Sequence, residues 1–217
     1  MASRPQDWER TQADVESIDW LGQTTLLRDV PARRNKETGA VLVNVDDMIK
    51  TRHRLWLSEM GVEEPRDFLT LLILYARPGW FRGGEVSNKF KLNKMLFYQW
   101  KKFEAEGLSD AIVHDEFICG RAGPIPGHLK DDLTRLARAG WLDVEWSAGP
   151  GTSTVTKLTA KGTQVAETLW LSSPEFIRSI TQAVKDELFP LDSKTIKEWF
   201  HRRFPEYRRT YTQLDQE

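Results

Sequence analysis

The polar side chains of residues 127–139 are the clearest candidates for chemistry in this sequence. Leu129, Leu133 and Leu136 recur there at spacings of three and four, so a helix would bury one face and turn the other to solvent. Arginine and histidine can donate hydrogen bonds to guanine edges, and threonine can contact phosphate. We therefore expect non-covalent recognition of double-stranded DNA by the solvent face, which carries His128, Lys130, Asp131, Thr134, Arg135 and Arg138.

Two features of the same region favour a different interpretation. Asp131 and Asp132 lie at the end of the helix that would enter the major groove, where a carboxylate repels phosphate. The turn at 147–153 contains no Lys or Arg, whereas protein segments that enter the minor groove usually bring one. The alternative is a solvated helix face with ion pairs at a spacing of four, such as Asp131 with Arg135.

Two further groups of basic residues could contact the phosphate backbone. The first lies around a predicted helix at 91–106, and its expected phosphate contacts are Lys91, Lys94 and Lys101. The second follows the last predicted helix, where basic side chains interleave with Trp199 and Phe200: Lys194, Lys197, Arg202, Arg203, Arg208 and Arg209. Basic residues between aromatic ones can line a nucleic-acid groove. A solvated helix end is the commoner explanation for the second group.

The sequence holds no motif that predicts catalysis. It lacks a phosphate-binding P-loop, a dinucleotide-binding glycine motif, a nucleophile elbow and a zinc-protease motif. His114, Asp115 and Glu116 are adjacent, but neighbours in a strand point to opposite faces and cannot converge on one metal. Cys119 is more readily explained as a structural cysteine than as a nucleophile. We expect no enzyme activity, no metal and no cofactor.

Composition limits the function classes further. The chain has 217 residues, a net charge of −1 and one cysteine, so no global positive field attracts nucleic acid and no intramolecular disulfide forms. No apolar run reaches the roughly 18 residues that span a bilayer. We expect a cytoplasmic protein that does not enter a membrane. Nine tryptophans indicate an aromatic core and a subunit interface, which predicts a homodimer.

The pattern around the candidate helix predicts the fold. After Gly140 the apolar period changes to two over 142–146, and a Gly-Pro-Gly turn leads to a second strand at 152–158. Thr159 then opens another helix. A helix followed by a two-stranded ribbon and a helix is typical of a winged helix, so we predict a mainly α protein with a small antiparallel β-wing. The predicted core is a winged helix-turn-helix with helical extensions at both ends.

Three regions are predicted along the chain. The N-terminal extension, 1–63, contains a helix from about Ser3, two short strand-like runs at 24–30 and 40–45, and a second helix at 47–60 capped by Asn44 or Asp46. The winged-helix domain, 64–171, begins with an all-apolar helix opened by Pro65. The C-terminal segment, 172–217, contains two helices, the second capped by Ser193.

Several blocks of the sequence resemble a known family group. KLNKMLFYQW (91–100), CGRAGPIPGHLKDDLTRLARAGWLDVE (119–145), TKLTAKG (156–162) and FHRRFPEY (200–207) are similar to motifs of small winged-helix proteins of the bacterial YwgA type. These proteins are more distantly akin to the Panacea and SocA-like antitoxin domains. The resemblance covers about 68–162 plus the terminal block. Arg121 and Ala122 replace the aromatic residue of the group, and the first 60 residues have no counterpart in it.

Two hypotheses follow. In the first, the protein is a dimeric DNA-binding regulator or antitoxin-like factor that uses the helix at 127–139. In the second, the same fold is a non-catalytic protein-interaction module of a defence or toxin–antitoxin complex, without DNA contact. A continuous positive face would favour the first hypothesis, and an exposed apolar patch would favour the second.

Overall fold

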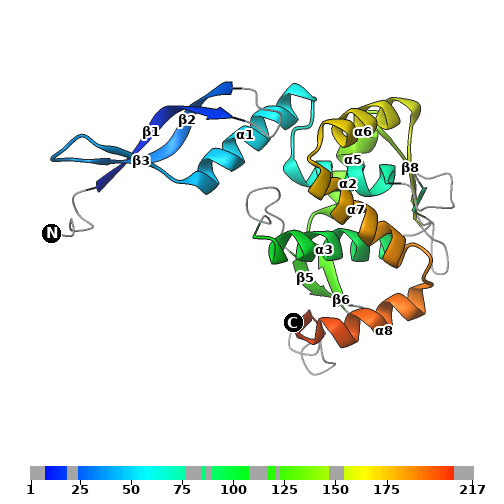
Figure 1. Ribbon diagram of the computed structural model, residues 1–217. Coiled ribbons are helices and arrows are strands. Elements are labelled where there is room, and N and C mark those ends of the chain that lie inside the picture. The colour runs from blue at the N-terminus through cyan, green and yellow to red at the C-terminus, as the bar shows by residue number, and fades with distance from the viewer. Residues whose placement is uncertain are drawn as a thin grey trace. The chain divides into compact units, whose positions relative to one another are not determined.

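The computed structural model describes residues 8–18, 24–76, 85–86, 89–107, 117–120, 123–146 and 154–207. The chain divides into two compact units, which we call unit 1 and unit 2. Unit 1 ends at Glu63 and unit 2 begins at Glu64; residues 110–112 group with unit 1 but lie outside the described ranges. Figure 1 shows the unit 1 elements in blue to cyan and the unit 2 elements in cyan to red.

Unit 1 is a three-stranded antiparallel sheet, of order β1-β2-β3, followed by a helix. Its elements are β1 (Trp8–Ile18), β2 (Thr24–Asn35), β3 (Val41–Val43) and α1 (Val45–Glu59). The prediction of a helix in the first 18 residues is wrong. Residues 11, 13, 15 and 17 are half-buried and their neighbours are exposed, which is the period of a strand with one covered face.

The covered face of this sheet forms the core of unit 1. Leu27 and Val30 of β2 are at most 1% exposed, and α1 packs on β2. Asn44 caps α1 as predicted, because its side chain accepts from the Asp46 backbone N–H at 2.9 Å. At the β2–β3 turn, the Asn35 side chain accepts from the backbone N–H groups of residues 37 and 38, and Gly39 has a φ of +70°.

Unit 2 is built around helix α2, which is buried on nearly every side. Pro65 opens this helix and residues 67–74 are all buried, as the sequence predicts. Helices α3, α6 and α7 pack on it. The helices of unit 2 are α2 (Pro65–Tyr75), α3 (Lys89–Ala105), α5 (Leu129–Arg138), α6 (Ala160–Ser172), α7 (Glu175–Leu188) and α8 (Ser193–Arg203), with a short 3₁₀ turn η2 (Pro205–Tyr207).

Unit 2 also contains a small sheet of strand order β4-β8-β7, and its strand β7 contacts α5. Its strands are β4 (Glu85–Val86), β7 (Leu142–Glu145) and β8 (Val155–Leu158). The predicted helix, Gly140 turn, strand and second strand are present in this order, and Gly140 has a φ of +75°. Thr159 caps α6 as predicted, since its hydroxyl accepts from the Gly162 N–H. The turn at 147–153 lies outside the described residues.

The last helices belong to unit 2 and pack on α3. Gln99 of α3 donates to Thr181 of α7 at 2.8 Å, and Phe200 of α8 is fully buried against Phe97. Asp192, rather than the predicted Ser193, caps α8, because its carboxylate accepts from the Thr195 N–H at 2.7 Å. A hairpin absent from the predictions, β5 (Phe117–Gly120) with β6 (Gly123–Pro126), also packs on α3. The structure is therefore mixed α and β with small antiparallel sheets.

Candidate interaction surfaces

Helix α5 presents three of its predicted DNA contacts to solvent. His128, Lys130 and Arg138 are exposed. Thr134 is half-buried, and its hydroxyl donates to the Lys130 carbonyl oxygen at 2.8 Å. The exposed surface of α5 also carries Asp131, so its charge is mixed and not continuously positive.

Arg135 joins α5 to α2 through carboxylates inside unit 2. Its Nε and one terminal nitrogen donate to the two oxygens of Asp67, at 3.0 and 2.7 Å, and the same terminal nitrogen donates to Asp132 at 2.8 Å. Asp132 also accepts from Arg66 at 2.7 Å. We call these four residues the α2–α5 ion cluster. The guanidinium of Arg135, which is 30% exposed, is engaged by two carboxylates, and its predicted contact with base edges stays a prediction.

Burial and pairing oppose each other within the α2–α5 ion cluster. The side chains of Asp67 and Asp132 are only 3% and 6% exposed. Burial raises the pKa of the Asp67 carboxyl, and the hydrogen bonds from Arg135 act in the opposite direction. The same bonds raise the pKa of the Arg135 guanidinium. The cluster therefore holds α5 on α2 through hydrogen bonds between its arginines and carboxyl groups.

Lys94 and Lys91 both donate to backbone carbonyl oxygens of unit 2, but Lys94 is buried and Lys91 only half-buried, so a phosphate contact by Lys91 stays a prediction. Lys94 is fully buried and donates to the Pro124 carbonyl oxygen at 2.6 Å, with the Phe90 and Phe200 rings 5.3 and 5.5 Å from its Nζ. Burial lowers the pKa of Lys94 to about 7. Lys91 donates to the Phe189 carbonyl oxygen at 2.7 Å. The prediction that Lys94 contacts phosphate is wrong because solvent does not reach its amine.

Lys101 belongs to an aromatic cluster that joins α3 to η2. Its Nζ pairs with Glu104 at 2.6 Å and lies 4.7 Å from the Trp100 ring and 5.6 Å from the Tyr207 ring. Arg203 lies similarly over Trp199, at 5.1 Å. These cation–π contacts stabilise the packing of the C-terminal elements on α3. Of the interleaved basic residues predicted in the last helix, Arg203 makes such a ring contact, and Lys194, Lys197, Arg202 and Arg203 all remain exposed.

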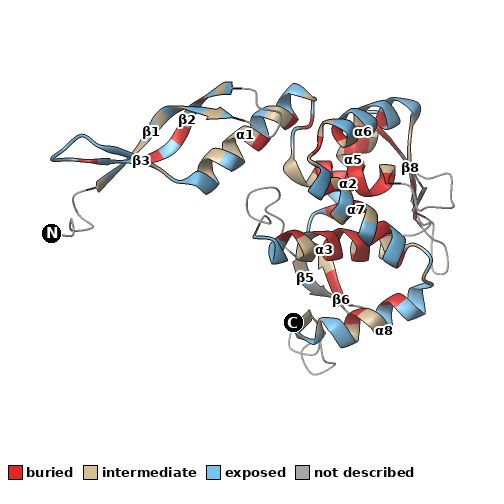
Figure 2. Ribbon diagram, viewed as in Figure 1, coloured by how far each residue is buried: buried red, intermediate tan, exposed pale blue. Residues whose placement is uncertain are grey.

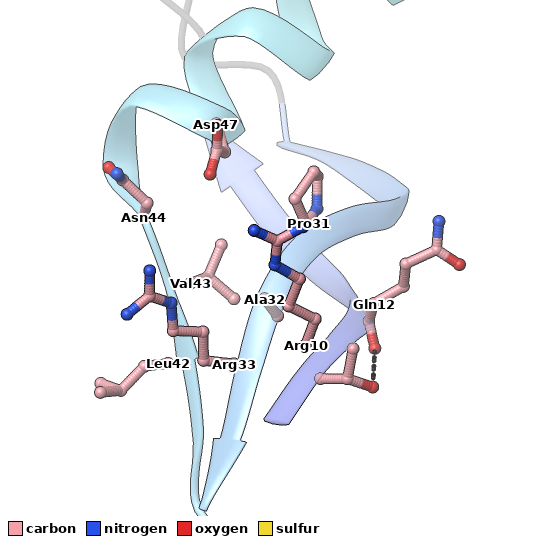
Figure 3. A pocket seen from close by; sticks show the side chains of 10 residues that line it. Arg10, Gln12, Pro31, Ala32, Arg33, Leu42, Val43, Asn44 and Asp47 are labelled. Atoms are coloured by element: carbon pink, nitrogen blue, oxygen red, sulfur yellow. Dashed lines mark hydrogen bonds between the residues drawn. The ribbon is translucent and has the colours of Figure 1, made fainter. Parts of the chain in front are cut away.

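Unit 1 contains a pocket of about 780 Å³ that sequence reasoning missed. Figure 3 shows its lining, which combines the three strands with the start of α1. Arg10 pairs directly with Arg33 across β1 and β2, and Arg33 pairs with Leu42 across β2 and β3. These three residues form one cross-strand row on a single face of the sheet. The prediction of a helix at the N-terminus hid this row, since a helix would have separated Arg10 from Arg33.

Exposed apolar side chains gather on unit 1. Among the described residues, seven exposed large apolar side chains lie in unit 1 and four lie in unit 2. Three of the seven follow one another over β3 and the first turns of α1, and we call them the β3–α1 patch: Leu42, Val45 and Ile49. Val41 is also exposed, but it precedes Leu42 in the strand and lies on the opposite face of β3. Figure 2 shows this stretch largely in the colour of exposed residues. Adjacent exposed apolar residues of this kind mark interaction surfaces more often than scattered ones do.

Other candidate residues do not form a site in the part of the chain that the structure describes. His114, Asp115 and Glu116 lie outside the described ranges, as do Arg208 and Arg209, and nothing is described of the Cys119 side chain. No three His, Cys, Asp or Glu residues within the described ranges are placed to hold a metal ion. Among the described helices, none combines the length and the apolar character needed to cross a bilayer.

No protein-family model matches the chain, and the search of curated proteins finds no match to its sequence.

Proposed function

We propose that this protein is a non-catalytic protein-interaction module that binds its partner through unit 1. The observation that carries the proposal is the β3–α1 patch, whose side chains are 42–65% exposed on a single small unit. Burial of such side chains on association is favourable by roughly 25 cal/mol for each Å² of apolar surface removed from water. The resemblance of residues 68–162 to antitoxin domains agrees with a role in a protein complex.

The packing of unit 2 supports a scaffold role. Its basic side chains at 66, 91, 94, 101, 135 and 185 bond to carboxylates or backbone carbonyls inside the unit. Among the basic residues of α5, Arg135 is used in this way, whereas Lys130 and Arg138 stay exposed. In this proposal unit 2 is the scaffold that carries the binding unit.

The test of the proposal is the native mass of the protein, together with any bound partner, after purification from the native host. We expect the wild-type protein to elute with a stoichiometric second protein, or as a homodimer, when its native mass is measured. Leu42→Asp should elute as a folded monomer, because a charge on the patch disfavours burial. Leu171→Asp is the matched control, since Leu171 of unit 2 is 67% exposed and lies outside the patch. A monomeric wild type, or equal loss in both variants, would contradict the proposal.

DNA binding through α5 is the second candidate. It is favoured by the order β4-β8-β7 with α5 directly before β7, which is the order of a winged helix. Its test is binding of random-sequence duplex DNA at low and moderate salt, measured by fluorescence anisotropy. Lys130→Glu with Arg138→Glu should abolish salt-dependent binding, because both residues are exposed. Absence of binding at low salt would remove this candidate.

A further inference from the structure

The two arginines of the unit 1 pocket stand directly opposite each other without a counter-ion. Arg10 and Arg33 are register partners on neighbouring antiparallel strands, where opposed side chains are about 5 Å apart at Cβ. Like charges in this arrangement destabilise a sheet. Within the described ranges, neither guanidinium forms an ion pair or a hydrogen bond. No described carboxylate is therefore bonded to the pair to offset its repulsion, and Asp47, which lines the same pocket, forms no ion pair with either guanidinium.

Other arginines of the protein show how such groups are normally satisfied. Arg66 and Arg135 each contact a carboxylate within 2.7 Å. Arg52 of α1 donates to the Ser17 hydroxyl at 2.7 Å. Exposed arginines such as Arg34 and Arg138 also form no ion pair with described residues, so what distinguishes Arg10 and Arg33 is their direct opposition across two strands of the pocket. A guanidinium is a planar fork that matches the two oxygens of a carboxylate, and each of these two arginines can bind one in a bidentate manner.

The pocket also offers an apolar wall beside the arginines. Leu42 continues the Arg10–Arg33 row and is 59% exposed, and Pro31 and Val43 line the same hollow. Figure 3 shows these side chains around the two guanidinium groups, with Asp47 at the start of α1. A volume of about 780 Å³ falls within the range of known ligand pockets. An occupant that suits both surfaces carries a carboxylate next to an apolar group.

We propose that this pocket binds an acidic peptide segment of the partner protein. One Asp or Glu carboxylate of the segment lies between Arg10 and Arg33, and a neighbouring apolar side chain packs on Leu42 and Pro31. This inference rests on the proposed function and names the chemistry of the partner. It also joins the pocket to the β3–α1 patch, because Leu42 belongs to both.

The charge of unit 1 favours a peptide over a nucleic acid. The described residues of unit 1 hold eight Lys and Arg but nine Asp and Glu. A polyanion would meet several of these carboxylates, including Asp47 in the pocket itself. A nucleic-acid backbone needs a row of cations that releases many counter-ions, whereas one pair of arginines is sufficient for a single carboxylate.

The test is binding of two labelled peptides to the full-length protein, measured by fluorescence anisotropy. The probe has the sequence Ser-Gly-Glu-Leu-Glu-Gly-Ser, and its partner has Gln in place of each Glu. We expect the Glu peptide to bind at least about tenfold more tightly, because bonds between charged groups are about twice as strong as neutral ones. Arg33→Gln and Arg10→Gln should each weaken its binding about tenfold.

The matched control is Arg34→Gln. Arg34 is exposed and carries the same charge, but it lies one residue along β2 and therefore on the opposite face of the sheet. It should change the dissociation constant less than about twofold. The thermal unfolding midpoint should not fall in Arg33→Gln, since the change removes a like-charge repulsion.

Four results would overturn the inference. Three are that the Glu peptide does not bind, that the Gln peptide binds equally well, or that Arg34→Gln weakens binding of the Glu peptide as much as Arg33→Gln does. The fourth is that random duplex DNA displaces the labelled Glu peptide at a lower concentration than unlabelled Glu peptide does. If Leu42→Asp still lowers the native mass relative to the wild type in these cases, only the acidic-segment inference fails. If the wild-type protein itself has the native mass of a monomer, the proposed function fails as well.

Discussion

At the scale of single residues, the main finding is which groups the charged side chains bind. Arg135 and Lys94, both predicted DNA contacts, bind partners within unit 2: Lys94 is fully buried, and Arg135 is 30% exposed. Arg135 is bound by Asp67, which lies 68 positions earlier in the sequence. Lys94 is bound by the carbonyl of Pro124, 30 positions later. These partners come from other elements, so helical periodicity alone could not reveal them.

Arg135→Ala tests the structural role of the α2–α5 ion cluster. It leaves the buried carboxylate of Asp67 without its bidentate partner, so we expect the free energy of unfolding to fall by about 2 kcal/mol. This is below the usual cost of breaking a buried pair, because the Arg135 side chain is 30% exposed and partly screened. Arg138→Ala is the control and should cost less than about 1 kcal/mol. Urea unfolding measures both, and equal losses would contradict the assignment.

The buried lysines predict a pH dependence of stability. Burial lowers the pKa of Lys94 to about 7 and that of Lys185 to about 8. In the unfolded chain both return to the usual lysine value of about 10.4, so the unfolded state binds more protons above pH 7. The free energy of unfolding should therefore rise as the pH increases from about 7 to about 9.5.

Lys94→Met isolates the contribution of one amine. Its free energy of unfolding should depend less steeply on pH than that of the wild type over the same range, because the variant has lost the amine whose pKa is lowered to about 7 and keeps Lys185 and Lys91, whose pKa values burial also lowers. The measurement is the urea midpoint at several pH values. A wild-type midpoint that stays level or falls with increasing pH would show that the amines are charged in the folded protein.

At the scale of elements, close backbone packing explains the start of α6. An added Cβ on Gly162 would lie 1.9 Å from the Trp141 carbonyl oxygen, which already accepts from the Thr159 N–H at 3.0 Å. The chain entering β7 thus passes directly against the first turn of α6. This contact explains the glycine at the end of the block at 156–162.

Gly162→Ala should destabilise the protein although it replaces a glycine within a helix. Such a change at an exposed helical site gains up to about 1 kcal/mol. Here the clash with backbone should cost at least about 2 kcal/mol. Thr163→Ala, at the exposed neighbouring position, is the control and should change stability by less than about 1 kcal/mol. A stabilised Gly162→Ala protein would show that Trp141 can move away.

Sequence patterns predicted the elements of unit 2 better than those of unit 1. Pro65, Thr159 and Gly140 are local signals that act within one turn, and the structure places each as expected. In β1 the inward residues are small or weakly apolar, such as Ala13 and Ser17, so the period of two carries little hydrophobic contrast. The pocket of unit 1 could not be found because the register of β1 on β2 was unknown.

At the scale of the whole molecule, the two units differ in the properties that an interaction module needs: one has a large core and the other has an exposed apolar surface. Unit 2 satisfies its buried charges internally and contains most of the core, including α2 and the rings around Phe97. Unit 1 has a small core and carries most of the exposed apolar side chains of the described residues. Its unpaired arginines lie beside those side chains. Unit 1 is therefore the part of the molecule on which we place the binding function.

Site-specific photocrosslinking in the native host tests this placement most directly. A photoreactive phenylalanine analogue at Leu42 samples the β3–α1 patch, and the same group at Leu171 samples an exposed position of unit 2. We predict a discrete crosslinked species that contains a second protein chain for the Leu42 position and none for the Leu171 position. Crosslinks to protein from Leu171 alone, or none from either position, would contradict the account.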